Sequence, residues 1–307
     1  MEKRPIAVIG AGLMGHGIAL TLAKAGHRVL VTDPVADALA AVTGRIAESL
    51  SLMGEDAGRI DEILSNVETC ESLQAAVSDS FAVFEAAPEK MDLKQQIFAE
   101  IEAHAPGDSL LASNTSVMPI TAIMQKLGKR GRSLGTHWWN PPHMIPLVEV
   151  IRTEWTSDET VDTMMSLLGE AGKTPVCVAK DVPGFIGNRL QHALWREAIS
   201  LVERGICDAE SVDTVIKSCF GRRLSVLGPL ENADLVGTDL TLDIHNTVLA
   251  DLESRPGPSP YLEKLVADGK LGMKSGEGFR KWTPEEADKV RKRVTTHLKR
   301  LETILEE

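Results

Sequence analysis

The sequence is poor in the features that mark secreted, metal-binding or membrane-spanning proteins. Its 307 residues include only four cysteines, which are widely spaced and form no C-x-x-C pair. This pattern is typical of unpaired thiols in a reducing compartment and offers no disulfide framework. No group of residues has the spacing of a metal site, so no metal is expected. No apolar run approaches the roughly 18 residues that a transmembrane helix needs.

Positive charge is also in short supply. The chain has 33 Lys and Arg against 44 Asp and Glu, a net charge of −11. This balance argues against a nucleic-acid or anionic-membrane partner. Regular structure is expected from Pro5 onward, which leaves no room for a signal peptide. The length suggests about two domains, and all of these features fit a cytoplasmic enzyme.

A glycine-rich turn near the amino end is the first informative motif. An apolar run over residues 6–9 precedes Gly10, Gly12 and Gly15 at G-x-G-x-x-G spacing, and Asp33 follows a second apolar run. In a strand–helix–strand context, such glycines give a tight turn, close approach to a pyrophosphate and close helix packing. An acid at the position of Asp33 accepts hydrogen bonds from the ribose hydroxyls of NAD and repels a 2′-phosphate. The motif predicts an NAD site; a turn that serves only helix packing is the alternative.

The rest of the chain shows two different patterns of predicted secondary structure. Predicted strands at 81–84, 109–112, 133–138, 145–151 and 174–179 alternate with helical patterns at 37–66, 92–104, 119–127 and 157–171. This alternation predicts an α/β fold, a Rossmann-type doubly wound and mostly parallel sheet. From Ile186 onward nearly every stretch has helical period. We therefore expect an NAD-binding domain over 1–185 and an all-α domain over 186–307.

Two features are expected inside the second domain. The segment 254–260, SRPGPSP, is predicted to be a loop because of its proline and glycine content. The charged tail from Glu285 has helical period and is predicted to be a surface helix, either solvated or packed on a partner subunit.

A histidine and an acid form the candidate catalytic pair. His137 ends one predicted strand, and Glu149 lies inside the next apolar strand. Burying an acid is costly unless it is paired, and His137 is the natural partner. A carboxylate that holds one imidazole nitrogen leaves the other free as a general base. A purely structural histidine is the alternative at this point. Trp138 and Trp139 are interpreted as core or pocket wall, and His143 as a loop residue.

Several stretches resemble the 3-hydroxyacyl-CoA dehydrogenase family, in the family's order and over nearly the whole chain. They are GAGLMGHGIA (10–19), Asp33, FEAAPEKMDLK (84–94), SNTS (113–116), HWWNPPHMIPLVEV (137–150), KDVPGFIGNR (180–189) and GKLGMKSGEGF (269–279). The resemblance implies NAD-dependent hydride transfer from a secondary alcohol and a homodimer formed through the helical domain. A dehydrogenase class with a catalytic lysine is disfavoured because its G-x-x-G-x-G-x-K motif is absent.

The same resemblance implies roles for individual residues. His137 matches the family's catalytic base and Glu149 its orienting acid. Ser116 matches a serine near the substrate hydroxyl and the nicotinamide, and Asn188 an asparagine that positions the substrate. The implied cofactor-binding residues are Gly10, Gly12, Leu13, Met14, Gly15, Asp33, Glu89, Lys94, Asn114, Asn140 and Lys274. A helix N-cap remains the alternative for Ser116, and a solvated helix residue the alternative for Lys94.

The hairpin after the second strand departs from the acyl-CoA branch of the family. Members that handle CoA resemble one another in lysines there, which meet the CoA phosphates. Here residues 53–62 contain four acids and one arginine, a charge that would repel a polyanion. Two tryptophans in HWWNPP also replace the commoner phenylalanines, which would narrow a pocket.

Other stretches resemble the CoA-independent branch. The run 221–231 is similar to lambda-crystallin/L-gulonate 3-dehydrogenase, and its Arg222 and Arg223 either bind a substrate carboxylate or are solvated. The pair NPPHMIP and KSGEG resembles a pyridine-carboxylate dehydrogenase of vitamin B6 breakdown. The prediction is an NAD-dependent dehydrogenase of a small CoA-free β-hydroxy carboxylate. The alternatives are a 3-hydroxybutyryl-CoA dehydrogenase and a non-catalytic NAD-binding or structural protein.

Overall fold

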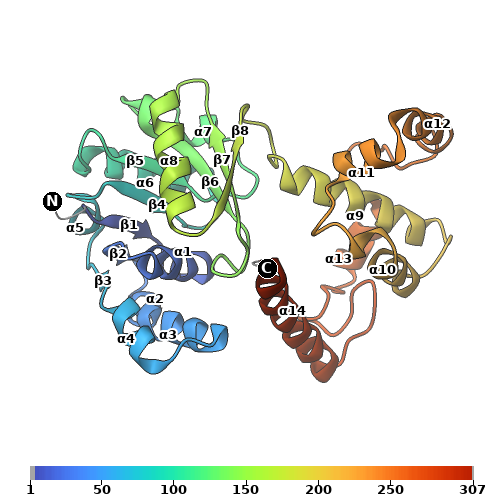
Figure 1. The fold of residues 1–307 in the computed structure, drawn as a ribbon, viewed down its shortest axis with the longest axis horizontal. Coiled ribbons are helices and arrows are strands. Elements are labelled where there is room, and N and C mark those ends of the chain that lie inside the picture. The colour runs from blue at the N-terminus through green and yellow to red at the C-terminus, as the bar shows by residue number, and fades with distance from the viewer. Residues whose placement is uncertain (1–3, 306–307) are drawn as a thin grey trace. The chain divides into compact units, whose positions relative to one another are not determined.

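The computed structural model describes residues 4–305, and the chain divides into two compact units. Of the described residues, 4–189 and 298–305 belong to the first unit, and 190–297 to the second. The first contains a β-sheet with helices on both faces, and the second is built from helices (Figure 1). The predicted fold class, a Rossmann-type sheet followed by helices, is confirmed.

The sheet has eight strands in the order β3-β2-β1-β4-β5-β6-β7-β8. Their bounds are β1 Ile6–Ile9, β2 Val29–Thr32, β3 Val67–Thr69, β4 Ala82–Glu85, β5 Leu110–Ser113, β6 Ser133–Trp138, β7 Leu147–Arg152 and β8 Thr174–Val178. Strands β1 to β6 run parallel, and β7 pairs antiparallel with β6. This is the doubly wound order, in which a cofactor binds where the strand order reverses, between β1 and β4.

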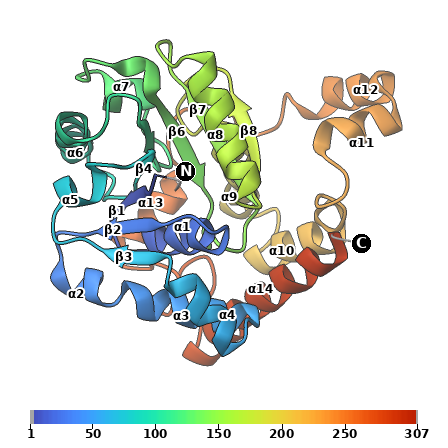
Figure 2. The same cartoon turned by 60° about the vertical axis from the view of Figure 1, so that its left-hand side comes forward.

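Helices cover both faces of this sheet (Figures 1 and 2). One face packs against α1 Leu13–Lys24, α3 Val42–Met53, α4 Ala57–Leu64 and α8 Asp158–Glu170; the other packs against α5 Leu73–Val77, α6 Met91–His104 and α7 Ile120–Met124. Strand β1 shows the division, because Ile6 and Val8 join the first core while Ala7 and Ile9 join the second. Alternate side chains of a strand point to opposite faces, so a strand between two layers is apolar throughout.

Three local features differ from the sequence-based expectation or extend it. The structure adds β3 and α5, which the pattern did not predict because β3 has three residues, two of them exposed. Residues 37–66 contain two main helices, α3 and α4, as expected, preceded by the short α2 Ala36–Ala40. Gly54 ends α3 at φ +97°, a left-handed conformation that glycine adopts without a steric penalty.

The chain after β8 is helical, as the sequence pattern predicts. Its helices are α9 Gly187–Glu203, α10 Ala209–Ser218, α11 Pro229–Val236, α12 Thr238–Val248, α13 Pro260–Ala267 and α14 Pro284–Leu305, with a short 3₁₀ turn at Phe220–Arg222. Another 3₁₀ turn, Arg130–Arg132, lies in the first unit before β6. The expected loop at 254–260 ends where α13 begins, and the expected tail helix is α14. Glu306 and Glu307, at the end of that prediction, lie outside the described residues.

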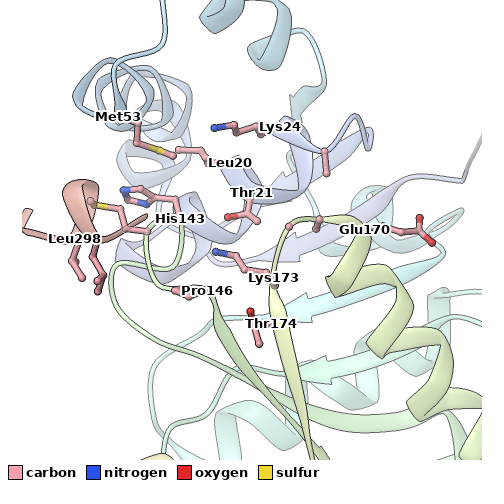
Figure 3. A pocket seen from close by; sticks show the side chains of 15 residues that line it. Leu20, Thr21, Lys24, Met53, His143, Pro146, Glu170, Lys173, Thr174 and Leu298 are labelled. Atoms are coloured by element: carbon pink, nitrogen blue, oxygen red, sulfur yellow. The ribbon is translucent and has the colours of Figure 1, made fainter. Parts of the chain in front are cut away.

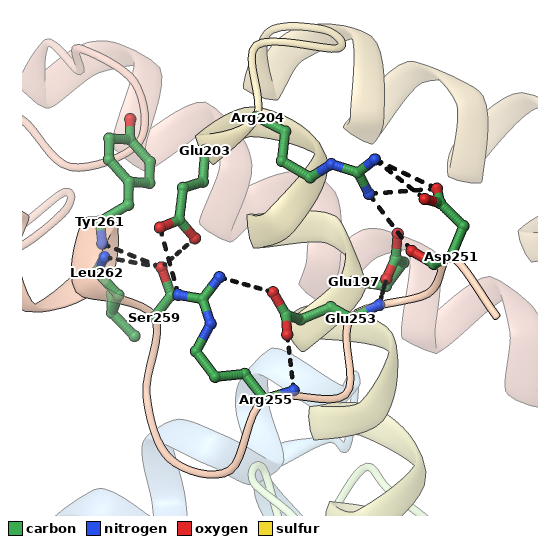
Figure 4. Close-up of polar contacts among 9 residues, drawn as sticks. All are labelled: Glu197, Glu203, Arg204, Asp251, Glu253, Arg255, Ser259, Tyr261 and Leu262. Carbon is green, nitrogen blue, oxygen red and sulfur yellow. Dashed lines mark hydrogen bonds and ion pairs between the residues drawn. The ribbon is translucent and has the colours of Figure 1, made fainter. Parts of the chain in front are cut away.

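Charged side chains hold the loop before α13 against the end of α9 (Figure 4). The guanidinium of Arg204 pairs with the Asp251 carboxylate at 3.3 Å, and the Ser259 hydroxyl donates to Glu203 at 3.0 Å. Arg255 pairs with Glu203 at 3.4 Å. The loop is therefore ordered by side-chain contacts rather than by regular structure. In residues 4–305 no helix combines the length and apolarity needed to cross a membrane.

Candidate functional site

The glycine turn leaves the first turn of α1 open to an anion. Gly10 has φ +108°, and a Cβ there would lie 2.8 Å from the carbonyl oxygen of Ala86. A Cβ at Gly15 would lie 1.8 Å from the carbonyl oxygen of Gly10, so neither position accepts a side chain. Gly12, the N-cap, faces open space, and no side chain caps the helix. The backbone amides of the first turn of α1 therefore have no capping acceptor. Together with the positive end of the helix, they fit the pyrophosphate of NAD.

Two side chains of opposite charge hold this turn in place. Asp33 accepts from the Ala11 amide at 2.7 Å and from the Val35 amide at 2.8 Å. Arg45, from α3, donates to the Ala11 carbonyl at 2.7 Å. Asp33 therefore stands beside the turn at the end of β2, where a ribose acceptor is needed. Arg45 was not predicted, because thirty-four residues separate it from its partner.

A buried ion pair lies under the next part of the site. The Lys94 ammonium, 1% exposed, is 2.7 Å from Glu85, whose other oxygen accepts from the Ser113 hydroxyl at 2.6 Å. A buried carboxylate needs such partners because its desolvation is costly. Lys94 is thus not a solvated helix residue. Its ammonium also lies 3.7 Å from Glu89, at the surface of the site.

The segment after β5 is tied to its neighbours by two predicted cofactor-binding residues. The exposed Glu89 accepts from the Ser116 amide at 2.6 Å. The buried Asn114 accepts from the Trp138 amide at 3.0 Å. The alternative role for Ser116 is not seen, because α7 begins after Pro119 with no side-chain cap.

His137 and Glu149 lie directly opposite each other on the antiparallel strands β6 and β7. His137 Nδ1 is 2.7 Å from Glu149 Oε2, and the two residues are 3% and 1% exposed. Glu149 Oε1 accepts from the amides of Ile186 at 2.8 Å and Gly187 at 3.0 Å. Burial raises the pKa of Glu149, but hydrogen bonds from His137 and these amides outweigh it, so the pKa lies below its usual value.

This geometry decides which imidazole nitrogen is available. An ionised carboxylate only accepts hydrogen bonds, so Nδ1 of His137 carries the proton that it donates to Glu149. Nε2 is then the nitrogen left to take a proton from another molecule. The structure thus brings together the pair that the sequence indicated.

The first turn of α9 also reaches Ser116. The Asn188 side-chain amide donates to the Ser116 carbonyl at 2.8 Å, and Asn188 is 9% exposed. Four catalytic candidates therefore cluster in the first unit. The other cofactor candidates are placed as follows: Leu13 exposed and Met14 half-buried on α1, Asn140 exposed after β6, and Lys274 exposed in the second unit, on the wall of a cavity of about 630 Å³.

Sequence reasoning missed four contributors for different reasons. The amides of Ile186 and Gly187 have no side-chain signal that a sequence pattern reveals. Arg45 acts across a long sequence separation. Glu85, by contrast, is an acid inside the apolar run 81–87, and the argument that identified Glu149 would have found it.

A second cavity, of about 590 Å³, lies on the flank of α1 (Figure 3). Leu20, His143, Lys173 and Leu298 are among its lining residues. The pKa of His143 is lowered to about 4, chiefly by burial and also by the nearby His16 and Lys173. Lys173 donates to two backbone carbonyls of the loop that carries His143. His143 is thus a half-buried loop residue, as expected.

Across residues 4–305, no three His, Cys, Asp or Glu side chains are grouped as a metal would require.

Comparison with known proteins decides the family. The model described as "3-hydroxyacyl-CoA dehydrogenase, NAD binding domain" matches residues 5–182, and that of the C-terminal domain matches residues 184–282. The chain belongs to the 3-hydroxyacyl-CoA dehydrogenase family. Like its relatives, this dehydrogenase is an NAD-dependent oxidoreductase that acts on CH–OH groups.

Two relatives of this chain are named for different kinds of substrate. The 5-formyl-3-hydroxy-2-methylpyridine 4-carboxylate 5-dehydrogenase of Mesorhizobium japonicum is 36% identical over 95% of this chain and 96% of its own. The mitochondrial hydroxyacyl-coenzyme A dehydrogenase of Homo sapiens is 38% identical over 90% of each chain.

The solved structures show the same two groups. A pyridine-carboxylate 5-dehydrogenase, described as an NAD⁺-dependent dismutase, has a TM-score of 0.91, 35% identity and 99% coverage of both chains. The (S)-3-hydroxybutyryl-CoA dehydrogenase of Ralstonia eutropha has a TM-score of 0.76 and 30% identity, and covers 92% of this dehydrogenase and 99% of its own chain.

Proposed function

We propose that this dehydrogenase oxidises a small carboxylate substrate that carries no CoA. The observation that supports this proposal most strongly is structural similarity. The TM-score is 0.91 over 99% of the chain with a pyridine-carboxylate dehydrogenase, but 0.76 over 92% of the chain with a hydroxybutyryl-CoA dehydrogenase. The substrate presents a hydroxyl-bearing carbon, as a β-hydroxy acid does. An aldehyde hydrate beside a ring carboxylate presents the same H–C–OH unit.

The charge of the α3–α4 hairpin supports the absence of CoA. Arg59 is the single cation of residues 53–62, the part that joins α3 to α4. It pairs with Glu62 at 2.6 Å, and Asp56 caps α4 by accepting from the Arg59 amide. Glu55 pairs with Lys24 from α1 at 2.7 Å. The hairpin thus offers no unpaired cation to a CoA phosphate, and its net charge is negative. Polyanion binding there is unfavourable.

The chain's residues divide the chemistry between proton handling and placement. Bound NAD supplies the hydride acceptor. His137 Nε2 takes the hydroxyl proton while the carbon loses its hydride, and Glu149 stabilises the imidazolium that forms. Ser116 and Asn188 orient the substrate beside Nε2. In the reverse direction His137 returns the proton to the carbonyl oxygen.

The substrate class is tested by the rate of NADH formation with paired substrates. L-3-hydroxybutyryl-CoA is compared with free L-3-hydroxybutyrate, L-gulonate, carnitine and hydroxymethyl or formyl pyridine carboxylates. We expect a free acid to give a kcat/KM at least about tenfold above the thioester. A thioester that is far better than every free acid would instead identify a 3-hydroxybutyryl-CoA dehydrogenase, the alternative that several relatives favour. If none of the substrates gives NADH formation, a non-catalytic role is favoured.

We further propose a division of labour along the chain. Residues 1–185 bind NAD, and residues 186–307 bind substrate and form a homodimer in the cytoplasm. The dimer is supported by exposed apolar side chains on α11 and α12, such as Leu230, Leu235 and Leu242, which are 79%, 73% and 61% exposed. None of the described side chains of α10, α11 or α12 is buried. Apolar surface on this scale is typical of an interface. Sedimentation of the purified protein as a monomer would refute it.

A further inference from the structure

The imidazole of His137 packs against two aromatic rings. Its centroid lies 5.0 Å from that of Trp139 and 5.6 Å from that of Phe185, with tilts of 52° and 53°. Glu149 supplies its hydrogen-bond contact in the structure. The orientation of Nε2 therefore depends on where these two rings stand, as well as on the carboxylate.

The partner carboxylate is held by the residues next to Phe185. The amides of Ile186 and Gly187 donate to Glu149 Oε1 as α9 begins. Among residues 4–305, Phe185 is the one non-glycine residue at positive φ, +51°. This conformation is strained for a side-chain-bearing residue, and Phe185 is nevertheless 1% exposed. Residues 185–187 thus touch both members of the dyad.

Gly187 connects the two arrangements because it has no side chain. A Cβ at Gly187 would lie 2.4 Å from Cζ2 of Trp139 and 3.2 Å from two further atoms of the indole. Contacts below 3.0 Å do not occur without movement, and the indole is rigid. Its Nε1 is buried and makes no hydrogen bond in the structure, so packing alone sets the position of the ring.

We propose that Gly187 is a positioning residue of the dyad: its missing side chain lets Trp139 pack into the first turn of α9 against His137. The first turn of α9, which orients Glu149, and the ring of Trp139, which orients the imidazole, are thereby packed against each other. Any side chain at 187 separates them. This inference rests on the proposed proton transfer by His137, but the geometry it describes is testable without a substrate.

The decisive experiment is a double-mutant cycle with Gly187→Ala, Trp139→Phe and the double variant. Phenylalanine lacks the fused ring that contains Cζ2, so it makes room for the new methyl group. We expect Gly187→Ala to lower kcat about 10- to 100-fold, the scale of a misplaced catalytic group, with KM and NAD affinity nearly unchanged. The double variant should recover most of that loss, because the new methyl group fills the space that the smaller ring leaves. Trp139→Phe alone should also lower kcat, but by less than Gly187→Ala, because the ring that orients the imidazole then packs loosely against Gly187.

A spectroscopic readout separates this inference from the proposed function. The proton that His137 Nδ1 donates to Glu149 should give a downfield NMR resonance, and observing it needs no substrate. It should shift or broaden in Gly187→Ala and return in the double variant. If no substrate is turned over by the unchanged protein, the proposed function fails while the resonance still tests the geometry.

The control is Gly44→Ala, at an exposed position of α3 where a Cβ meets nothing within 4 Å. It should change neither kcat nor the resonance. Melting temperatures of all variants show whether each one folds. Unchanged kcat and an unchanged resonance in folded Gly187→Ala would overturn the proposal. So would a double variant as impaired as Gly187→Ala, because the glycine would then act through something other than Trp139.

Discussion

At the scale of single residues, the site depends on polar groups whose hydrogen-bonding capacity is assigned by their neighbours. Glu149 accepts hydrogen bonds from His137 and from two backbone amides, and so leaves His137 one orientation. A histidine with Nδ1 committed in this way presents Nε2 to a substrate without further ordering. This pre-organisation is what a general base needs.

We expect His137→Gln to lose about 10²- to 10⁴-fold in kcat, the usual contribution of a positioned acid–base group. Its affinity for NAD, measured by fluorescence titration, should be unchanged because the glycine turn is not touched. Turnover above about a tenth of the unchanged rate would contradict the assignment of His137 as the base.

Asp33 carries a second prediction at this scale. Replacing it with alanine removes the carboxylate that disfavours a 2′-phosphate and also releases the Ala11 amide. We therefore expect Asp33→Ala to raise the KM for NAD and to lower the NAD-to-NADP ratio of kcat/KM at least about tenfold. Asp33→Asn keeps an acceptor for the amide and is the matched control for the turn. A ratio that stays constant in Asp33→Ala would show that Asp33 does not contact the ribose.

At the scale of elements, a buried ion pair joins three parts of the first unit. Glu85 ends β4, Lys94 lies in α6, and Ser113 ends β5. Lys94→Met leaves an unpaired buried carboxylate, and we expect it to lower the free energy of unfolding by about 3–5 kcal/mol. Chemical denaturation measures this loss.

The double variant Glu85→Gln with Lys94→Met removes both charges and should regain much of that stability. Lys264→Met, which breaks an exposed pair with Asp268 on α13, is the control and should change stability little. If Lys94→Met were as mild as this control, the buried pair would not be what joins the elements.

The elements also show how far the sequence can be interpreted. Periodicity predicted the long helices and the two-faced strands, because burial on one or both faces leaves a regular apolar pattern. It missed β3, whose three residues are too few to show alternation. It indicated His137 and Glu149, since an acid among apolar residues demands a partner. It gave no sign of the amides of Ile186 and Gly187, which act through the backbone, or of the strained Phe185.

At the scale of the whole molecule, the pH dependence of stability has an identifiable source. His143 has a folded-state pKa of about 4, below the value of about 6.5 in an unfolded chain. The unfolded state therefore binds more protons between these values, so the stability from neutral His143 is present above pH 6.5 and is lost as pH falls toward 4. His16 and Lys173, which face it, add to this effect.

Melting temperatures between pH 7.5 and pH 5 test this source. The unchanged protein should lose more stability on acidification than His143→Gln, which has no titrating group at this position. The gradient will be less than the full linkage slope because His143 is only half-buried. His104→Gln, at the exposed end of α6, should behave as the unchanged protein. Parallel pH curves for the unchanged protein and His143→Gln would exclude this source.

The antiparallel pairing of β6 with β7 has a consequence for enzyme engineering. The partners His137 and Glu149 are aligned by strand register, so the connection between them is not what aligns them. Insertions or randomised residues between Asn140 and Pro146 leave that register intact, provided that Trp139 is kept. Sequence diversity can therefore be introduced in this connection without redesigning the alignment of the two catalytic partners.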